Sequence, residues 1–346
     1  IAKKDKNVKI HRNEGPNRLG HTILYDTLVN DYATNDIVMI YHADMYACPG
    51  LDDQVLKLMK PGTVVSATRI EPPLHPDGPE KILLDCGIEP EEFDEDKLLT
   101  WLNTTDTGAK PTKGIFAPWA IYKKDFQAIN GHDPLYAPQS KEDSDIFNRF
   151  VLVGYDLVQT WKGFVYHMTS RGSRFKDGAF RNPAGQVFMK GRESSEWLEQ
   201  NLRSTRNFIR KWGHMVKHDK MMYPIIPPKY DIGFVVKNCE NKMLVELEPW
   251  CSTIYVNCNF KDYIYVEQKK TAFNLSDRIK PYDDEKNNNI IVEFDATRLN
   301  ADNFQILVNL SEILRDSAEV GEMELDIFKF NINSLETYEK DLIIRK

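Results

Sequence analysis

A run of apolar residues that ends on a histidine and an aspartate constrains this chain most. Residues 36–50 read DIVMIYHADMYACPG, in which 37–41 are apolar throughout and His42 and Asp44 precede a Pro-Gly turn. Such a strand is typical of a sheet that helices cover on both faces, which favours an α/β fold. Binding sites in these sheets lie beyond the carboxyl ends of the strands, where His42 and Asp44 fall.

Patterns along the rest of the chain predict the same class of fold. Residues 8–41 indicate a short strand, a loop rich in Gly, Pro and Asn, a helix, and the strand described above. We expect further strands over 62–70 and up to His167, and a helix over 143–153. Residues 194–218 predict a basic amphipathic helix, interrupted near its end by a glycine, that either packs on the protein or lies on a membrane surface.

A proline-rich stretch marks a domain boundary. YPIIPPKYD, residues 223–231, holds three prolines, which interrupt any helix or strand. Beyond it, strand patterns and helix patterns with polar starts follow one another. We therefore expect one domain over 1–224 and a smaller α/β domain of unknown role over 225–346.

The charge balance and cysteine content limit the classes of partner. Lys and Arg number 45 against 52 Asp and Glu, a net charge of −7, so a broad cationic face for nucleic acid or anionic lipid is not expected. No stretch approaches the roughly 18 apolar residues of a membrane span, and the first residues lack the apolar core of a signal peptide, so we expect a cytoplasmic protein. Five cysteines without a Cys-x-x-Cys pair predict free thiols.

Carboxylates gather at two places in the sequence. Asp44, at the end of a buried strand, requires a cationic partner, either a metal or an arginine such as Arg69. Glu142, Asp143 and Asp145 open the helix in KEDSDIFNRF. Helix capping explains one of the three, but close like charges also raise one another's pKa, which suits a general base.

A third stretch supplies nitrogen groups. FVYHMTSRGSR is an apolar strand that ends on His167 and continues into a loop with Arg171 and Arg174. A single histidine at a strand end is more often structural. Taken with the carboxylates, however, it indicates a metal held by a carboxylate and an imidazole, guanidinium groups for phosphate, and a nearby carboxylate base.

These stretches resemble a known family. The run 114–170 is similar to the second half of a family 2 glycosyltransferase of the GT-A fold, and residues 13–45 are similar to that family's Asn/Gly loop, helix and Asp-x-Asp metal motif. The matching positions are Gly114, Lys123, Phe126, NGHD at 130–133, EDSD at 142–145, Arg149, Gly154, Tyr155 and His167.

The resemblance implies a reaction and a set of roles. Asp44 and His167 match the family's ligands of a divalent metal, Mn²⁺ or Mg²⁺, which bridges the diphosphate of a nucleotide-sugar. Asp143 matches the general base that deprotonates an acceptor hydroxyl, with Glu142 in support, so that the sugar is transferred with inversion. Asp145 is expected to support them, with capping of the helix as its candidate role.

The donor side of the predicted site departs from the family at one position. His42 stands where the family has the first Asp of its metal motif, so a group that can be neutral replaces a carboxylate. Arg69, Arg171 and Arg174 are the candidates for binding the diphosphate. For Arg69, a salt bridge to Asp44 or to Glu71 is an equal alternative.

The acceptor side rests on three residues. Trp119, His132 and Asp133 lie in the stretches that match the family's acceptor region, and an aromatic ring such as that of Trp119 stacks well on a sugar. A place in the core is an equal alternative for Trp119. The expected partners are a nucleotide-sugar donor and a glycan or other hydroxyl acceptor.

The opening of the family fold has no counterpart in the sequence. We expect the GT-A domain over 1–224 to lack the first strand and helix. Two rival functions follow: a non-catalytic relative that binds a sugar or nucleotide, and a nucleotidyltransferase, which uses the same metal and nucleotide chemistry.

Overall fold

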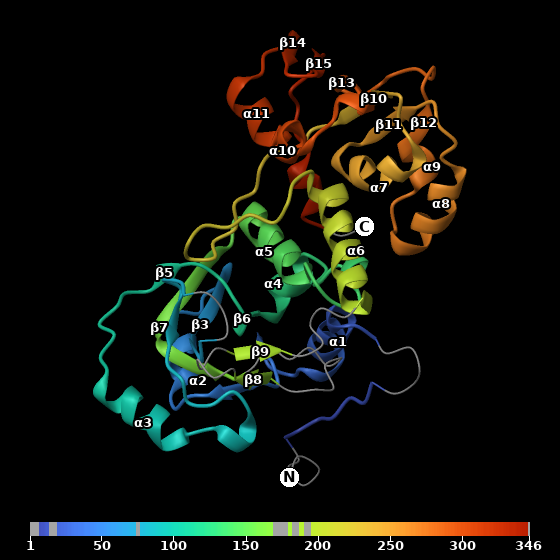
Figure 1. Cartoon of the computed structure of the whole chain (residues 1–346). Coiled ribbons are helices and arrows are strands. Elements are labelled where there is room, and N and C mark those ends of the chain that lie inside the picture. Colours follow the sequence, from blue (N-terminus) through green and yellow to red (C-terminus); the bar gives the residue numbers. More distant parts are fainter. Residues whose placement is uncertain are drawn as a thin grey trace. The chain divides into compact units, whose positions relative to one another are not determined.

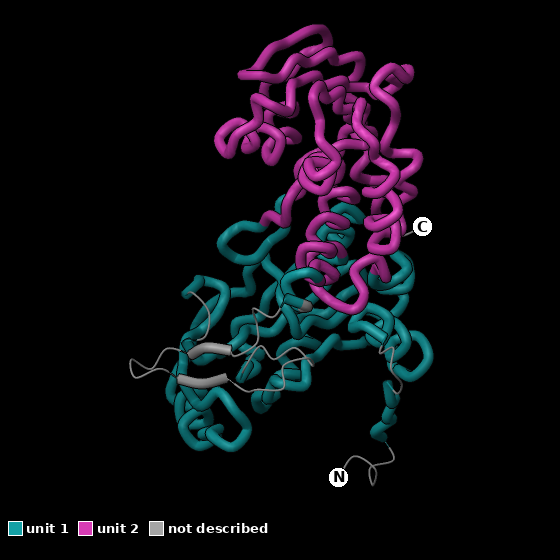
Figure 2. The backbone as a smooth tube through the Cα atoms, turned by 45° about the vertical axis from the view of Figure 1, so that its right-hand side comes forward, with its two compact units in different colours: residues 1–132, 146–199, 218–225 teal, residues 133–145, 200–217, 226–346 magenta. Residues whose placement is uncertain are grey.

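The computed structural model describes residues 7–13, 19–73, 77–168, 179–181, 187–189 and 195–344. It is a mixed α/β structure with a seven-stranded and a six-stranded sheet, which confirms the predicted class (Figure 1). The chain divides into two compact units that interleave along the sequence (Figure 2). Unit 1 comprises 1–132, 146–199 and 218–225, and unit 2 comprises 133–145, 200–217 and 226–346. The domain bounds 1–224 and 225–346 stay a prediction.

The seven-stranded sheet belongs to unit 1 and is mixed rather than parallel. Its order is β1-β6-β3-β7-β2, with β4 beside β3 and β5 beside β7. Its strands are β1 (Ile37–Ile40), β2 (Met45–Ala47), β3 (Thr63–Glu71), β4 (Lys81–Leu83), β5 (Thr112–Lys113), β6 (Trp119–Tyr122) and β7 (Asp156–His167). Among the described strands of this sheet, only the β3–β7 and β3–β4 pairs are parallel. A separate hairpin pairs β8 (Ala179–Arg181) with β9 (Val187–Met189).

Two predictions about strands need correction. Residues 8–10, expected to form a strand, contain no regular structure. Residues 37–40 of the apolar run form β1, which pairs with β6 in antiparallel orientation and alternates buried and half-buried residues. The strand buried at every position is β3, which lies between β6 and β7. An apolar run alone does not distinguish a central strand from an edge strand.

Short helices connect these strands. They are α1 (His21–Thr27), which continues as a π-helical turn (Leu28–Tyr32), α2 (Leu51–Leu56), α3 (Glu95–Thr104), α4 (Lys123–Ala128) and α5 (Glu142–Val153), with 3-10 turns at Pro90–Glu92 and Pro134–Tyr136. The division between the units falls inside α5, after Asp145. Among the helices of the described ranges, none is long and apolar enough for a bilayer span.

The six-stranded sheet belongs to unit 2. Its order is β12-β11-β10-β13-β15-β14. The strands β12, β11, β10 and β13 are parallel to one another, whereas β15 is antiparallel to both of its neighbours, β13 and β14. The strands are β10 (Ile232–Lys237), β11 (Thr253–Val256), β12 (Ile279–Pro281), β13 (Ile290–Asp295), β14 (Gly321–Leu325) and β15 (Phe328–Ile332). This confirms that strands and helices both follow the proline-rich stretch.

Helices of unit 2 pack on one continuous core. They are α6 (Ser195–Trp212), α7 (Leu244–Leu247), α8 (Lys261–Glu267), α9 (Leu275–Arg278), α10 (Ala301–Val308) and α11 (Leu310–Ser317), with 3-10 turns at Asn241–Met243, Glu248–Trp250, Gln268–Lys270, Ala296–Arg298 and Glu339–Leu342. The predicted helix over 194–218 is α6, which ends at Trp212 and is followed by Gly213, whose φ of +80° suits a glycine. Phe208 and Trp212 of α6 are fully buried, which favours packing over a membrane surface.

A buried ion network joins α6 to the rest of unit 2. Arg210 lies 2.7 Å from Glu248 and 2.9 Å from Glu267, and Arg278 also pairs with Glu248. Glu248 is fully buried, which raises the pKa of a carboxyl, but Arg278 and Arg210 outweigh burial and leave the pKa of Glu248 below its usual value. Glu248 is therefore charged in the folded state and compensates two buried guanidinium groups.

We expect Glu248→Gln to lower the free energy of unfolding by about 3–5 kcal/mol, because it leaves buried arginine charge uncompensated. Urea denaturation measures the change. The matched control is Glu324→Gln, whose partner Lys329 is 71% exposed, and it should cost no more than about 1 kcal/mol. Equal losses in the two variants would contradict a structural role for the network.

Candidate active site

Strand pairing brings Asp44 and His167 together. The loop after β1 carries Asp44 into β2, and β2 pairs with the end of β7 so that Met45 lies opposite His167. The Met168 N–H donates to the Asp44 carbonyl at 3.1 Å. In this register, His167 Nε2 lies 3.6 Å from Asp44 Oδ2. Two side chains 123 positions apart in the numbering, the two predicted metal ligands, thus face one another within unit 1.

Glu71 holds the other nitrogen of His167. Glu71 Oε1 lies 2.9 Å from His167 Nδ1, and the carboxylate also contacts Arg69 at 2.8 Å and Lys81 at 3.2 Å. Its side chain is 2% exposed, and burial raises the pKa of a carboxyl, but the hydrogen bond from His167 and the nearby cations lower it to about 2. A permanently charged acceptor at Nδ1 fixes the imidazole with Nε2 toward Asp44.

The two carboxylates also set the charge of His167. Burial lowers the pKa of this imidazole, but its interactions with the carboxylates of Asp44 and Glu71 outweigh burial and raise the pKa. The sequence did not single out Glu71 as a site residue. It is a charged residue at the carboxyl end of a strand buried at every position, which is the same signal that drew attention to Asp44.

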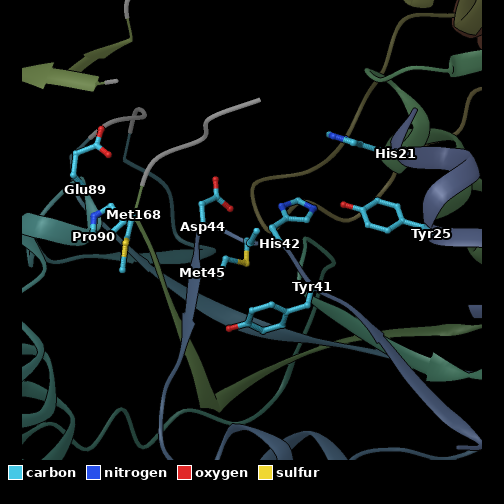
Figure 3. Close-up of a pocket in the computed structure, with 10 residues that line it drawn as sticks. His21, Tyr25, Tyr41, His42, Asp44, Met45, Glu89, Pro90 and Met168 are labelled. Carbon is cyan, nitrogen blue, oxygen red and sulfur yellow. The ribbon is translucent and has the colours of Figure 1, made fainter. Parts of the chain in front are cut away.

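Asp44 opens onto a cavity of about 590 Å³ in unit 1. The cavity is lined by His21, Tyr25, Tyr41, His42, Ala43, Asp44, Met45, Glu89, Pro90 and Met168. Figure 3 shows the side chains of His42 and Asp44 on the same side of their loop, while that of Tyr41 points the other way. The rings of Tyr25 and His42 are nearly parallel, at 9° and 6.4 Å between centroids. Aromatic walls beside a carboxylate suit a ligand with both a ring and a charged group.

Asp44 and His167 supply part of the ligand set that a divalent cation needs. Within the described ranges, no three His, Cys, Asp or Glu side chains come together as a ready metal site. Asp44 and His167 offer one oxygen and one nitrogen, and their 3.6 Å separation is too long for a strong hydrogen bond. Cations that act on nucleotides commonly use one or two carboxylates and complete their coordination with substrate phosphates and water. The residues present therefore suit a cation held jointly by protein and substrate.

Arg69 is occupied by structural contacts. Its side chain is 5% exposed, pairs with Glu71 at 2.8 Å and Glu80 at 3.3 Å, and lies 3.7 Å from the centre of the Phe116 ring. The salt-bridge alternative is therefore the one that the structure shows, and the prediction that Arg69 binds the diphosphate is corrected. Arg171 and Arg174 lie outside the described residues.

Two of the three acceptor candidates lie in the core of unit 1. Trp119 and His132 are fully buried, with their ring centroids 6.1 Å apart. The backbone N–H of His132 donates to Asp26 at 3.0 Å, and its Nδ1 lies 3.0 Å from the same carboxylate. The core alternative therefore holds for Trp119, and neither ring offers a face to a sugar. Their prediction as acceptor residues is corrected.

The NGHD turn has a structural explanation. Asn130 and Gly131 both have φ near +60°, and a Cβ on Gly131 would lie 2.6 Å from the Asp26 carboxylate. Arg149 is fully buried and donates to the Ile129 carbonyl at 2.9 Å and to the Gly131 carbonyl at 2.7 Å. Several residues that carry the family resemblance therefore shape this turn.

The acidic start of α5 belongs to unit 2. Glu142 is 8% exposed, and burial together with the charge of Asp143 raises its pKa to about 8. The preceding residues Ser140 and Lys141 have φ of +82° and +73°, an uncommon conformation for residues other than glycine. Of the two causes of the raised pKa, burial is the larger, and the charge of Asp143 adds to it. The catalytic roles of Asp143 and Glu142 stay predictions.

Asp145 and Asp133 are tied to α6 through one lysine. Lys211 Nζ lies 2.7 Å from Asp145 and 2.7 Å from Asp133. Asp145 also accepts from Trp212 Nε1 at 2.9 Å and is fully buried, so it anchors α5 and is not a solvent-facing cap. Asp133 lines a separate cavity of about 380 Å³ in unit 2, and its acceptor role stays a prediction.

Comparisons with known proteins do not identify a family for this chain. No protein-family model matches the chain, and no curated protein matches its sequence. Solved structures do match, among them the crystal structure of GalNAc-T7 with UDP, GalNAc and Mn2+, at 12% sequence identity and a TM-score of 0.35. That match covers 57% of this chain and 36% of that chain, so the chain spans little more than a third of its length. A likeness of this size shows no family.

The raised pKa of Glu142 predicts a pH dependence of stability. The pKa of Glu142 in the folded state, about 8, lies above its ordinary value of 4.5. The stability that the protonated side chain contributes is therefore fully present below about pH 4.5 and is lost as the pH rises through 8. In urea denaturation from pH 5 to 9, the free energy of unfolding of Glu142→Gln should increase relative to that of wild type as the pH rises. Asp143→Asn should weaken the dependence, because it removes the neighbouring charge.

Ser144→Ala, a non-titrating change in the same turn, serves as the control. It should keep the wild-type dependence on pH. A Glu142→Gln profile parallel to that of wild type would show that Glu142 does not bind its proton in this range.

Proposed function

We propose that the protein is a metal-dependent, inverting glycosyltransferase that transfers a sugar from a nucleotide-diphosphate donor to an acceptor hydroxyl. One observation carries the proposal: Asp44 and His167 converge at 3.6 Å beside a cavity lined by aromatic residues, and Glu71 orients the imidazole. The resemblance of the sequence to family 2 glycosyltransferases supplies the reaction for that arrangement.

Asp44 and His167 would hold Mn²⁺ or Mg²⁺ together with the donor. The cation would neutralise charge on the departing diphosphate. Glu71 accepts a hydrogen bond from Nδ1 of His167, so Nε2 would be the nitrogen that loses its proton and binds the cation. The Tyr25 and His42 rings form the wall of the cavity nearest to α1 and suit a flat part of the donor.

Asp143 is the proposed general base. Glu142, protonated up to about pH 8, would place a neutral carboxyl next to it. In the proposed reaction Asp143 accepts the proton of the acceptor hydroxyl, and Glu142 supports it.

Two other functions use the same residues. A nucleotidyltransferase would use the cation at a nucleotide triphosphate, and a binding relative would keep the donor without turning it over. Replacement of the family's first Asp by His42 is the feature that favours a binding relative.

We expect Mn²⁺-dependent release of nucleoside diphosphate from at least one member of a nucleotide-sugar panel. Asp143→Asn should lower the rate by about 10²–10⁴-fold, since it removes a general base, while the donor and Mn²⁺ still raise the melting temperature. Asp44→Asn should abolish both the turnover and the metal-dependent thermal shift. Coupled detection of nucleoside diphosphate and differential scanning fluorimetry provide the two measurements.

Asp53→Asn, an exposed carboxylate on α2, is the matched control and should leave both readouts unchanged. Pyrophosphate as the product would replace the proposal with a nucleotidyltransferase. Donor binding without any product would replace it with a binding relative.

A further inference from the structure

The sheet of unit 2 contains a topological switch point. From β10 the chain moves through β11 to β12 on one side, and it then returns to place β13 on the other side of β10. All four strands are parallel, so the segments that follow β10 and β13 leave the sheet in opposite directions at its carboxyl edge. In open α/β sheets, ligands bind in the crevice at this point. The predicted site in unit 1 makes no use of it.

A cavity of about 580 Å³ lies between the segments that follow these two strands. Met243 and Leu247 line it from the segment after β10, and Leu299 and Phe304 from the segment after β13. Pockets that hold small molecules typically measure about 300–1,000 Å³ and combine apolar walls with a few polar groups. The size and position both fit a ligand site.

The polar groups of the cavity disfavour a phosphate. Asn300 Oδ1 accepts from the backbone N–H groups of Asp302 and Asn303, at 2.9 and 3.0 Å, so the first turn of α10 has these amides already satisfied. The chain after β10 reads NCENKM and has no glycine that would let the backbone wrap an anion. Glu246 adds a carboxylate to the lining, and the lysine of the lining, Lys242, is already paired with Glu240 at 2.7 Å. An uncharged ligand is therefore favoured over a nucleotide.

The same lining suits a sugar. Glu246, Gln305 and Lys242 offer hydrogen-bond acceptors and donors of the kind that hydroxyl groups require. Phe304 adds an aromatic surface, and its ring is fixed edge to face against Trp250 at 6.2 Å and 86°. Rigid aromatic rings pair with the apolar face of a sugar while polar side chains bind its hydroxyls.

We infer that this cavity binds a neutral sugar residue and thereby tethers a glycan to unit 2. The inference rests on the proposed function in one respect: a glycan is the acceptor that a glycosyltransferase extends. The site itself needs neither the cation nor the donor, so the two proposals can fail separately.

Saturation-transfer NMR on the full chain tests the inference. The probes are neutral disaccharides built from glucose, galactose, mannose and N-acetylglucosamine, without metal or nucleotide. We expect saturation transfer to at least one of them. Phe304→Ala and Gln305→Ala should each weaken binding at least tenfold, whereas Asp44→Asn should leave it unchanged.

Tyr265→Ala is the matched control for Phe304→Ala, since it truncates an aromatic side chain of unit 2 that is 70% exposed and outside the cavity. It should keep full binding. Gln305→Ala covers the case in which the loss of Phe304 disturbs folding. No transfer to any disaccharide, or transfer that survives both cavity variants, would overturn the inference, whatever the outcome of the donor assay.

Discussion

The arrangement of the candidate site depends on one buried imidazole held between two carboxylates. His167 contacts Glu71 through Nδ1 at 2.9 Å and faces Asp44 through Nε2 at 3.6 Å. Burial of these charges would be costly if they were not paired, and Arg69 and Lys81 complete the neutralisation around Glu71. The pairing of β2 with β7 is thus stabilised by the same contacts that give His167 a single orientation. His167, Asp44 and Glu71 therefore stabilise the fold and also form the proposed metal site.

In unit 2, paired buried charges hold a helix in place. Glu248 compensates Arg210 and Arg278, and the network fixes α6 to the sheet-bearing part of the unit. Lys211 of the same helix ties down Asp145 in the first turn of α5. Glu142 and Asp143 lie in that turn, so the position of the proposed base depends on contacts made by α6. These contacts therefore hold the start of α5 in place without a ligand.

Part of the site could be predicted because strand ends are visible in the sequence. Asp44 and His167 follow apolar runs, and their convergence needed only that both strands end at one edge. Glu71 was missed because its importance depends on the register of β3 with β7, which an apolar pattern does not reveal. Trp119 and His132 were misassigned because an aromatic residue in a matching motif can as well belong to the core. The mixture of parallel and antiparallel pairs in the seven-stranded sheet could not be predicted either, because the direction of a strand leaves no pattern in its composition.

The central claim is that Asp44 and His167, with Glu71 behind the imidazole, bind one divalent cation. Electron paramagnetic resonance of free Mn²⁺, titrated with the protein in the presence of a nucleoside diphosphate, measures this binding directly. The account predicts a single site whose affinity falls about 10–100-fold in Glu71→Gln, as expected when a group that orients a metal-binding histidine is removed. Equal Mn²⁺ affinity in wild type and Glu71→Gln, or no binding by wild type, would contradict it.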